Sequence, residues 1–324
     1  MSTKKLHYKE DSDDEREEGG GDAESRLANS PWVKAESVLG TWLSNLPKVN
    51  KFVPNQFPKM KLNATITVYG AGGTGKSFFC RWYLDGYKDY FPWGWCFTKT
   101  KHNDQYQIMM PDRYIIKQFN AELLTKIKER QMKAREIAVK PDSDFNPLAF
   151  LIWDDYMGND IKFSEALYEY YCVRRHFGTF NLYCAQTRTI TPPVIRLNTQ
   201  LAVCFNSDSS SHLEGLAEDF GGKIPKRVFI EWFRNIVEEP RVFFAIDNNP
   251  NTPPDQKYFS GMAEYVPVDV DHVMGSVGYW RHSLKQLQKI HDGSLERERE
   301  KWEQIVEPWE KGKTVQDKKS NSRK

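Results

Sequence analysis

The spacing of hydrophobic positions changes repeatedly between residues 59 and 265. Short apolar or β-branched runs, which are typical of strands, alternate with longer stretches whose apolar residues recur at helical spacing. Predicted helices follow Lys76 and cover 120–139 and 164–177, and predicted strands cover 64–69, 93–97, 148–153, 180–185 and 201–206. This alternation predicts an α/β fold with a mostly parallel central sheet flanked by helices. Two further strand patterns, 241–247 and 257–259, predict a hairpin that closes the domain.

The two ends of the chain differ from this central segment. Residues 1–30 are rich in acidic residues and glycine and have no regular apolar spacing, so they cannot bury enough surface to offset the entropy of ordering. We expect a disordered acidic tail at 1–30, a helical lead-in segment at 31–58, and a charged helical extension with a basic tail at 266–324. Residues 59–265 then form the main domain.

Composition excludes several classes of protein. The formal net charge is only +2, and the five cysteines are scattered without a C-x-x-C pair, so neither a disulfide framework nor a zinc site is indicated. No apolar run approaches the ~20 residues that span a bilayer. The first residues also lack the apolar segment of a secretory signal. We therefore expect an intracellular protein with no membrane-spanning segment.

A glycine-rich motif follows the predicted strand 64–69. Residues 70–77 have the spacing G-x-x-x-x-G-K-[ST], in which a tightly folded backbone points its N–H groups at phosphates. Lys76 can reach the β and γ oxygens, and Ser77 can bind Mg²⁺. The predicted nucleotide-binding residues are Gly70, Gly72, Gly73, Thr74, Gly75, Lys76 and Ser77. The expected ligands are a nucleoside triphosphate, taken as ATP, and Mg²⁺.

Two adjacent carboxylates follow a second buried strand pattern. Asp154 and Asp155 come directly after the apolar residues 150–153, about 80 residues beyond the glycine-rich motif. Ligands of parallel α/β sheets bind at the carboxyl ends of the strands. We expect Asp154 to bind Mg²⁺ together with Ser77, and Asp155 to act as the base that polarises the attacking water.

A third strand pattern, 180–185, ends in the amide Gln186. An amide both donates and accepts hydrogen bonds, so Gln186 can orient the water or contact the γ-phosphate. Just before this strand, Arg174 and Arg175 offer guanidinium groups that can stabilise the charge of the transition state, in the same subunit or in a neighbouring one. An ordinary solvated helix end is the alternative for the two arginines.

Together these motifs resemble those of the viral DNA-packaging ATPases of the FtsK/HerA superfamily of P-loop NTPases, in particular the poxvirus-type enzymes. The matching text is residues 70–77, 151–155 and 174–187, and it continues through Pro192 and Pro193 to Asn198. The resemblance covers about residues 60–260. It implies a RecA/FtsK-like P-loop ATPase domain at 59–265.

The resemblance also implies a function. The family hydrolyses ATP in an oligomeric ring to drive double-stranded DNA into a capsid, so it implies DNA and a capsid or portal-vertex protein as partners. It implies nucleotide, metal and catalytic roles for Lys76, Ser77, Asp154, Asp155 and Gln186, with Arg174 or Arg175 acting in trans. The expected location is the host cytoplasm, in a viral factory, or the nucleus, with association with the virion as a further expectation.

Three alternatives remain open from the sequence. Replication helicases of small DNA viruses share the phosphate loop and the paired acids, but their third strand usually ends in Asn rather than in a residue such as Gln186. Nucleoside or nucleotide kinases share the loop but need an acceptor pocket and an arginine-bearing lid. A scaffold that binds nucleotide without turnover would keep the loop intact, although the presence of Asp155 and Gln186 argues against it.

Overall fold

The computed structural model describes residues 44–54, 62–99, 104–156, 159–267 and 272–287, with isolated positions between 296 and 303. The chain divides into one unit of residues 1–46 and another of residues 47–324, and every element described below belongs to the second unit. The acidic tail predicted at 1–30, most of the helical lead-in and the basic tail lie outside the described residues. No helix among the described residues is long and apolar enough to cross a membrane.

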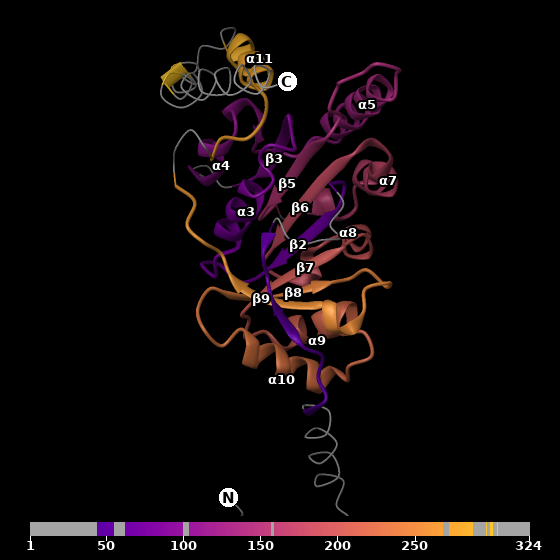
Figure 1. The fold of residues 1–324 in the computed structure, drawn as a ribbon, viewed down its shortest axis with the longest axis vertical. Coiled ribbons are helices and arrows are strands. Elements are labelled where there is room, and N and C mark those ends of the chain that lie inside the picture. The colour runs from indigo at the N-terminus through magenta and orange to yellow at the C-terminus, as the bar shows by residue number, and fades with distance from the viewer. Residues whose placement is uncertain are drawn as a thin grey trace, which may run out of the picture. The chain divides into compact units, whose positions relative to one another are not determined.

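The described residues contain a nine-stranded sheet with the order β1-β9-β8-β7-β2-β6-β5-β3-β4 (Figure 1). Neighbouring strands are parallel except that β8 is antiparallel to both β7 and β9. The strands are β1 (Val49–Lys51), β2 (Thr65–Tyr69), β3 (Trp93–Thr98), β4 (Ile115–Ile116), β5 (Ala149–Asp154), β6 (Thr179–Ala185), β7 (Leu201–Phe205), β8 (Val242–Asp247) and β9 (Tyr258–Met262). The predicted α/β class and the predicted hairpin are confirmed.

Helices connect and flank the strands. Three of them begin at N-cap residues, Asn120, Ser164 and Ser209, whose side chains accept hydrogen bonds from backbone N–H groups of the first turn. The helices are α3 (Lys76–Asp85), α4 (Asp104–Met109), α5 (Ala121–Ala138), α6 (Asn159–Lys162), α7 (Glu165–Val173), α8 (Pro193–Leu197), α9 (Ser210–Phe220), α10 (Lys226–Ile236) and α11 (Val277–Leu287). The short turns η3 (Arg174–Phe177) and η4 (Arg188–Ile190) lie on either side of β6.

β1 lies within the segment 31–58 that the sequence predicted as helical. Val49 pairs with Tyr258 in a parallel ladder between β1 and β9. Phe52, the residue that follows β1, is buried, and its ring lies 5.3 Å from that of Phe243 and 6.1 Å from that of Phe79. A three-residue strand is too short to show a period of two, and its pairing depends on a strand about two hundred residues away, so the sequence pattern did not indicate it.

The predicted C-terminal extension begins as part of the fold rather than as an appendage. Tyr279 and Trp280 of α11 are buried, and the Tyr279 hydroxyl donates a hydrogen bond to the carbonyl of Gly94 in β3 at 2.7 Å. The backbone N–H of Met274 donates to the carbonyl of Met109 at 2.8 Å. The change in composition near residue 265 therefore marks the end of the sheet and not the end of the packed domain. The charged pattern predicted at 295–306 lies almost wholly outside the described residues.

An aromatic cluster holds α3 against the sheet. The ring of Phe79 lies 4.9 Å from Phe243 and 6.3 Å from Phe205, and it stacks on Tyr83 at 5.6 Å. Such pairs contribute about 0.5–1.5 kcal/mol each beyond the area they bury. Since Phe79 follows the glycine-rich motif by only a few residues, the cluster fixes the start of α3 relative to β7 and β8.

Candidate nucleotide-binding site

The register of the sheet brings the predicted motifs to one edge. Tyr69 at the end of β2 pairs with Ala185 at the end of β6, and Asp154 at the end of β5 pairs with Cys184. The N–H of Gly70 donates to the carbonyl of Ala185 at 3.2 Å. We refer to the edge at which β2, β5 and β6 end as the carboxyl edge. The glycine-rich loop, the paired acids and Gln186 all lie there, as predicted for ligand binding in a parallel sheet.

The glycine-rich loop leads directly into the first turn of α3. Gly73 and Gly75 have φ values of 78° and 106°, which only glycine adopts at little cost. Gly75 is the N-cap of α3 and provides no capping side chain, so the first N–H groups of the helix remain available to an anion. A Cβ on Gly70 would lie 2.6 Å from the Thr74 hydroxyl and 2.8 Å from the Phe205 Cβ. The loop thus needs glycine at positions 73 and 75 because of the positive φ, and at position 70 because a Cβ would clash.

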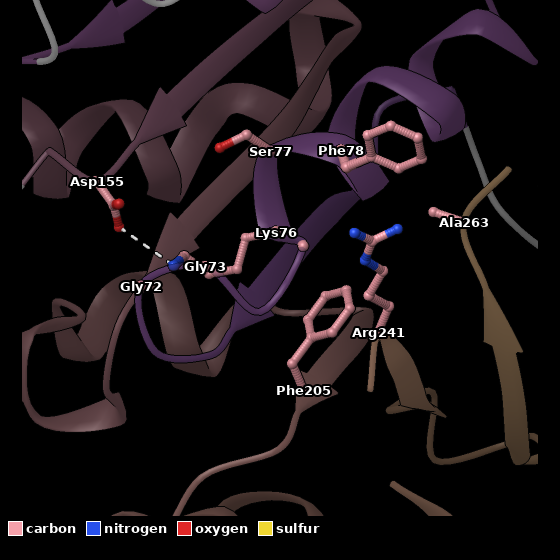
Figure 2. Close-up of a pocket in the computed structure, with 10 residues that line it drawn as sticks. Gly72, Gly73, Lys76, Ser77, Phe78, Asp155, Phe205, Arg241 and Ala263 are labelled. Carbon is pink, nitrogen blue, oxygen red and sulfur yellow. Dashed lines mark ion pairs between the residues drawn. The ribbon is translucent and has the colours of Figure 1, made fainter. Parts of the chain in front are cut away.

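A cavity of about 340 Å³ opens over this loop (Figure 2). Its lining combines the loop backbone with charged and aromatic side chains from β5, β7, β8 and the segment after β9. The lining residues are Gly72, Gly73, Gly75, Lys76, Ser77, Phe78, Asp155, Phe205, Arg241 and Ala263. The predicted residues Lys76, Ser77 and Asp155 are therefore brought together in one cavity.

The carboxylates occupy two distinct positions beside the loop. Asp154 is 2% exposed, and its Oδ2 accepts a hydrogen bond from the Ser77 hydroxyl at 3.3 Å. Asp155 has a φ of 45°, a left-handed conformation that is uncommon for a residue other than glycine. This turn directs its carboxylate into the cavity, where Oδ1 lies 3.8 Å from the Nζ of Lys76 (Figure 2). The Lys76 Nζ also donates to the carbonyl of Ala71 at 3.0 Å.

The donor set fits a magnesium ion at Ser77 and Asp154. Mg²⁺ prefers oxygen ligands and commonly takes one or two carboxylates, with water and phosphate oxygens completing its shell. A hydroxyl and a buried carboxylate lie side by side here, next to the glycine-rich loop. Among the described residues no cluster of three or more His, Cys, Asp or Glu side chains forms an all-protein metal site.

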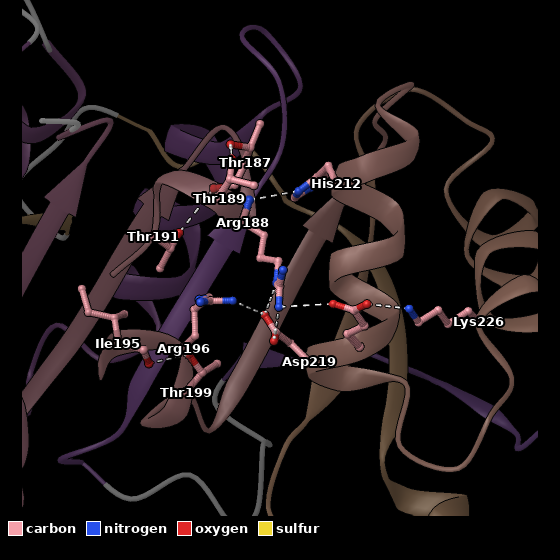
Figure 3. Close-up of polar contacts among 11 residues, drawn as sticks. Thr187, Arg188, Thr189, Thr191, Ile195, Arg196, Thr199, His212, Asp219 and Lys226 are labelled. Carbon is pink, nitrogen blue, oxygen red and sulfur yellow. Dashed lines mark hydrogen bonds and ion pairs between the residues drawn. The ribbon is translucent and has the colours of Figure 1, made fainter. Parts of the chain in front are cut away.

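Gln186 is half-buried, and the turn that follows it is held by a polar network (Figure 3). The N–H of Arg188 donates to the Nδ1 of His212 at 3.0 Å. The Arg188 guanidinium makes two hydrogen bonds to Asp219, at 2.6 and 2.9 Å. Arg196 adds a third contact to the same carboxylate at 3.2 Å. Because His212 and Asp219 belong to α9, this helix fixes the turn that begins at Gln186.

The acceptor role of His212 requires a neutral ring. Its side chain is 1% exposed, and burial together with the positive charge of Arg188 lowers the pKa of His212 to about 4. The ring also meets the ring of Tyr69 edge-on at 5.8 Å. Burial raises the pKa of Tyr69 above its usual value, so its phenol remains neutral as well. At neutral pH the turn η4 therefore contacts α9 in two ways, through the uncharged ring of His212 and through the ion pair between Arg188 and Asp219.

The structure does not bring Arg174 and Arg175 to the cavity. Both belong to η3, which precedes β6, whereas the cavity lies where β6 ends, roughly 20 Å away for a seven-residue strand. Arg174 is fully buried, and its guanidinium donates to the carbonyls of Asn63 and Asn198. The Arg174 side chain therefore has structural contacts at the opposite edge of the sheet and does not reach the cavity of its own chain. Arg175 is exposed at that same edge and has no place in the cavity of its own chain.

Sequence reasoning missed Arg241 and Phe205, which line the cavity. Arg241 precedes β8 and has a φ of 69°. Only its position after Pro240 and before an apolar run was visible in the sequence. Because β8 is antiparallel to β7, the start of β8 meets the end of β7 at the carboxyl edge. That direction could not be deduced from the spacing of apolar residues.

No family model matches the chain. Among known proteins, the chain is 27% identical over 189 residues to "Uncharacterized protein 075L" of Invertebrate iridescent virus 6, an alignment that covers 57% of this chain and 70% of that one. It is 24% identical over 252 residues to "Uncharacterized protein 015R" of Frog virus 3, covering 75% and 74% of the two chains. The sequence relatives named here are thus viral proteins.

Solved structures that resemble this chain include a viral packaging protein and a conjugation coupling protein. The genome packaging NTPase B204 of Sulfolobus turreted icosahedral virus 2, in complex with ATP-gammaS, is 14% identical with a TM-score of 0.46 and covers 63% of this chain and 100% of that one. The pCW3 conjugation coupling protein TcpA, with ATPgS, is 12% identical with a TM-score of 0.47, covering 71% and 73%.

Proposed function

We propose that the protein is an ATP-hydrolysing motor that moves double-stranded DNA into a viral capsid. The observation that carries the proposal is the convergence of Lys76, Ser77, Asp154 and Asp155 at one edge of the sheet, with Ser77 and Asp154 within hydrogen-bond distance and Lys76 facing Asp155. Gln186 ends the strand between β2 and β5, so it is adjacent to both the loop and the acids. A site with these parts binds and hydrolyses a nucleoside triphosphate.

Each side chain has a role that follows from its position. The loop N–H groups and the start of α3 bind the phosphates, and Lys76 offsets the charge of the β and γ oxygens. Asp155 accepts the proton of the attacking water as the bond to the γ-phosphorus forms, and ADP departs. Gln186 orients that water through its amide. Ser77 and Asp154 would hold Mg²⁺, which would supply positive charge to stabilise the negative charge on the phosphates.

The DNA and capsid parts of the proposal rest on the resemblance of the sequence motifs. Viral relatives at 27% and 24% identity are consistent with it. A motor of this kind binds DNA mainly through ionic contacts from Lys and Arg side chains to the DNA phosphates. We therefore expect the affinity to be independent of the DNA sequence and to fall as the salt concentration rises. We further propose that the chain works as a homo-oligomeric ring, in which Arg175 of one subunit can approach the nucleotide of the next.

Steady-state ATP hydrolysis with and without long double-stranded DNA tests the proposal. We expect duplex DNA to stimulate turnover, and Asp155→Asn to reduce kcat by about 10²–10⁴-fold because the amide cannot accept the proton. Glu231→Gln, which removes an exposed carboxylate on α10, is the matched control and should keep the rate of the wild type.

The outcomes separate the competing functions. Turnover that ignores DNA, or phosphate transfer to a nucleoside acceptor, would favour a kinase over a motor. Retained turnover in Asp155→Asn would remove the assignment of Asp155 as the base. Unwinding of a forked duplex without movement along blunt duplex DNA would favour the helicase alternative.

A further inference from the structure

Arg241 reaches the cavity from a hairpin that the phosphate-loop motifs do not include. Val242 pairs with Met262, so Arg241 and Ala263 lie opposite one another just beyond the last pair of the β8–β9 ladder. Both residues line the cavity (Figure 2). The open end of this hairpin therefore forms one wall of the nucleotide site.

This wall lies on the side of the loop away from the acids. In Figure 2, Asp155 stands on one side of Lys76, while the guanidinium of Arg241 stands on the other, near Phe78 and Phe205. The γ-phosphate belongs beside Asp155, where the attacking water is polarised. A nucleotide that spans the cavity then extends its α-phosphate and its base toward Phe78 and Arg241.

The environment of Arg241 suits a ligand rather than a structural role. Within the part of the chain that the structure describes, no carboxylate or carbonyl pairs with its guanidinium. The backbone of Arg241 has a φ of 69°, which costs conformational energy in residues other than glycine and asparagine. Strained backbone of this kind is found mainly at functional sites. An exposed, unpaired and strained arginine at the mouth of a phosphate site is poorly explained by packing.

Two aromatic rings continue the surface beside Arg241. Phe78 is half-buried, and its ring lies 6.4 Å from that of Tyr265 at an angle of 33°. Tyr265 follows Ala263 by two residues and is 69% exposed. Aromatic faces of this kind stack on nucleobases without needing a particular sequence of hydrogen bonds.

We propose that Arg241, Phe78 and Tyr265 form the subsite for the nucleoside end of ATP, with the Arg241 guanidinium on the α-phosphate and the two rings against the base. This inference rests on the proposed ATPase function and adds binding residues to it. Arginine suits the role because its planar fork pairs with phosphate oxygens. The hairpin would thus hold the part of the nucleotide that is common to ATP and ADP.

Calorimetric titration with ATP, ADP and inorganic tripolyphosphate tests the subsite. Arg241→Gly, which suits the positive φ and so preserves the fold, should weaken ATP and ADP by the same factor, about tenfold to a hundredfold. In steady-state ATP hydrolysis, Arg241→Gly should raise KM and leave kcat unchanged. Arg241→Lys should recover part of the affinity because it keeps the charge. Tyr265→Ala should weaken ADP but not tripolyphosphate, which has no base.

Controls separate this inference from the proposed function. Arg234→Ala, an exposed arginine on α10, should bind ATP like the wild type. Lys76→Ala should lose ATP affinity; if it does not, or if the wild type binds no nucleotide, the ATPase proposal itself is refuted and the subsite with it. If Lys76→Ala fails to bind and Arg241→Gly binds normally, only the subsite is refuted. A loss confined to ATP would also overturn it, because Arg241 would then contact the γ-phosphate.

Discussion

Acid should release the turn after Gln186 by protonating His212. The neutral Nδ1 of His212 accepts the hydrogen bond of the Arg188 N–H at 3.0 Å, and a proton on that nitrogen would remove the acceptor. The folded pKa of about 4 lies below the ordinary value of 6.5, a difference that corresponds to about 3 kcal/mol. The unfolded chain therefore binds this proton more tightly than the native protein does.

The sign of the effect follows from that difference. Above pH 6.5 both states are neutral at His212 and the contact is fully stabilising. As the pH falls from 6.5 toward 4, the unfolded state gains the proton first, so the free energy of unfolding drops by about 2 kcal/mol at pH 5. The positive charge of Arg188 lowers the pKa of His212 in the same direction as burial does, and the nearby carboxylates of Asp219 and Glu218 pair with Arg188.

The control variant is His212→Asn, whose side-chain oxygen can accept the same hydrogen bond but does not titrate. Urea unfolding at pH 7 and pH 5 should show a difference between wild type and variant that changes by about 2 kcal/mol, because the carboxylates contribute equally to both. Titration of the imidazole resonance by NMR gives the pKa directly. A measured pKa near 6.5, or parallel stability profiles for the two proteins, would refute the reasoning.

Three further predictions concern stability and catalysis. Gly70→Ala should lower the free energy of unfolding by about 1–3 kcal/mol through the clash with β7, whereas Gly72→Ala, with nothing within 4 Å of its Cβ, should change it by less than about 0.5 kcal/mol; urea unfolding compares them. Asp219→Asn should cost about 1–3 kcal/mol, checked by the same method, since it leaves two guanidinium groups underpaired. Arg174→Ala should destabilise the fold by about 3 kcal/mol or more, whereas Arg175→Ala should leave the stability unchanged. Arg175→Ala should reduce the DNA-stimulated kcat if Arg175 acts on the nucleotide of a neighbouring subunit. Equal melting temperatures for the two variants would contradict the structural role of Arg174.

Much of the fold was visible in the sequence because it depends on local patterns. The strand that ends at Asp154 has an unbroken apolar run, and those that end at Tyr69 and Ala185 are mostly apolar or β-branched, as is typical of buried parallel strands. The glycine-rich loop was recognisable because its backbone conformation needs glycine at fixed spacing, as the φ of Gly75 illustrates. Residues attached directly to the ends of such strands, including Gln186, were therefore placed correctly at the carboxyl edge.

The sequence alone determined the longer strands, the loop and the acids, because each depends on residues adjacent in the chain, whereas the short strands β1 and β4 were not indicated. Only the tertiary structure decided which edge of the sheet each arginine occupies. Arg174 precedes a parallel strand and lies at the far edge, buried among carbonyls. Arg241 precedes an antiparallel strand and lies in the cavity. Apolar spacing reports that a strand exists, but its direction is set by pairing between segments distant in the chain, which no local pattern encodes.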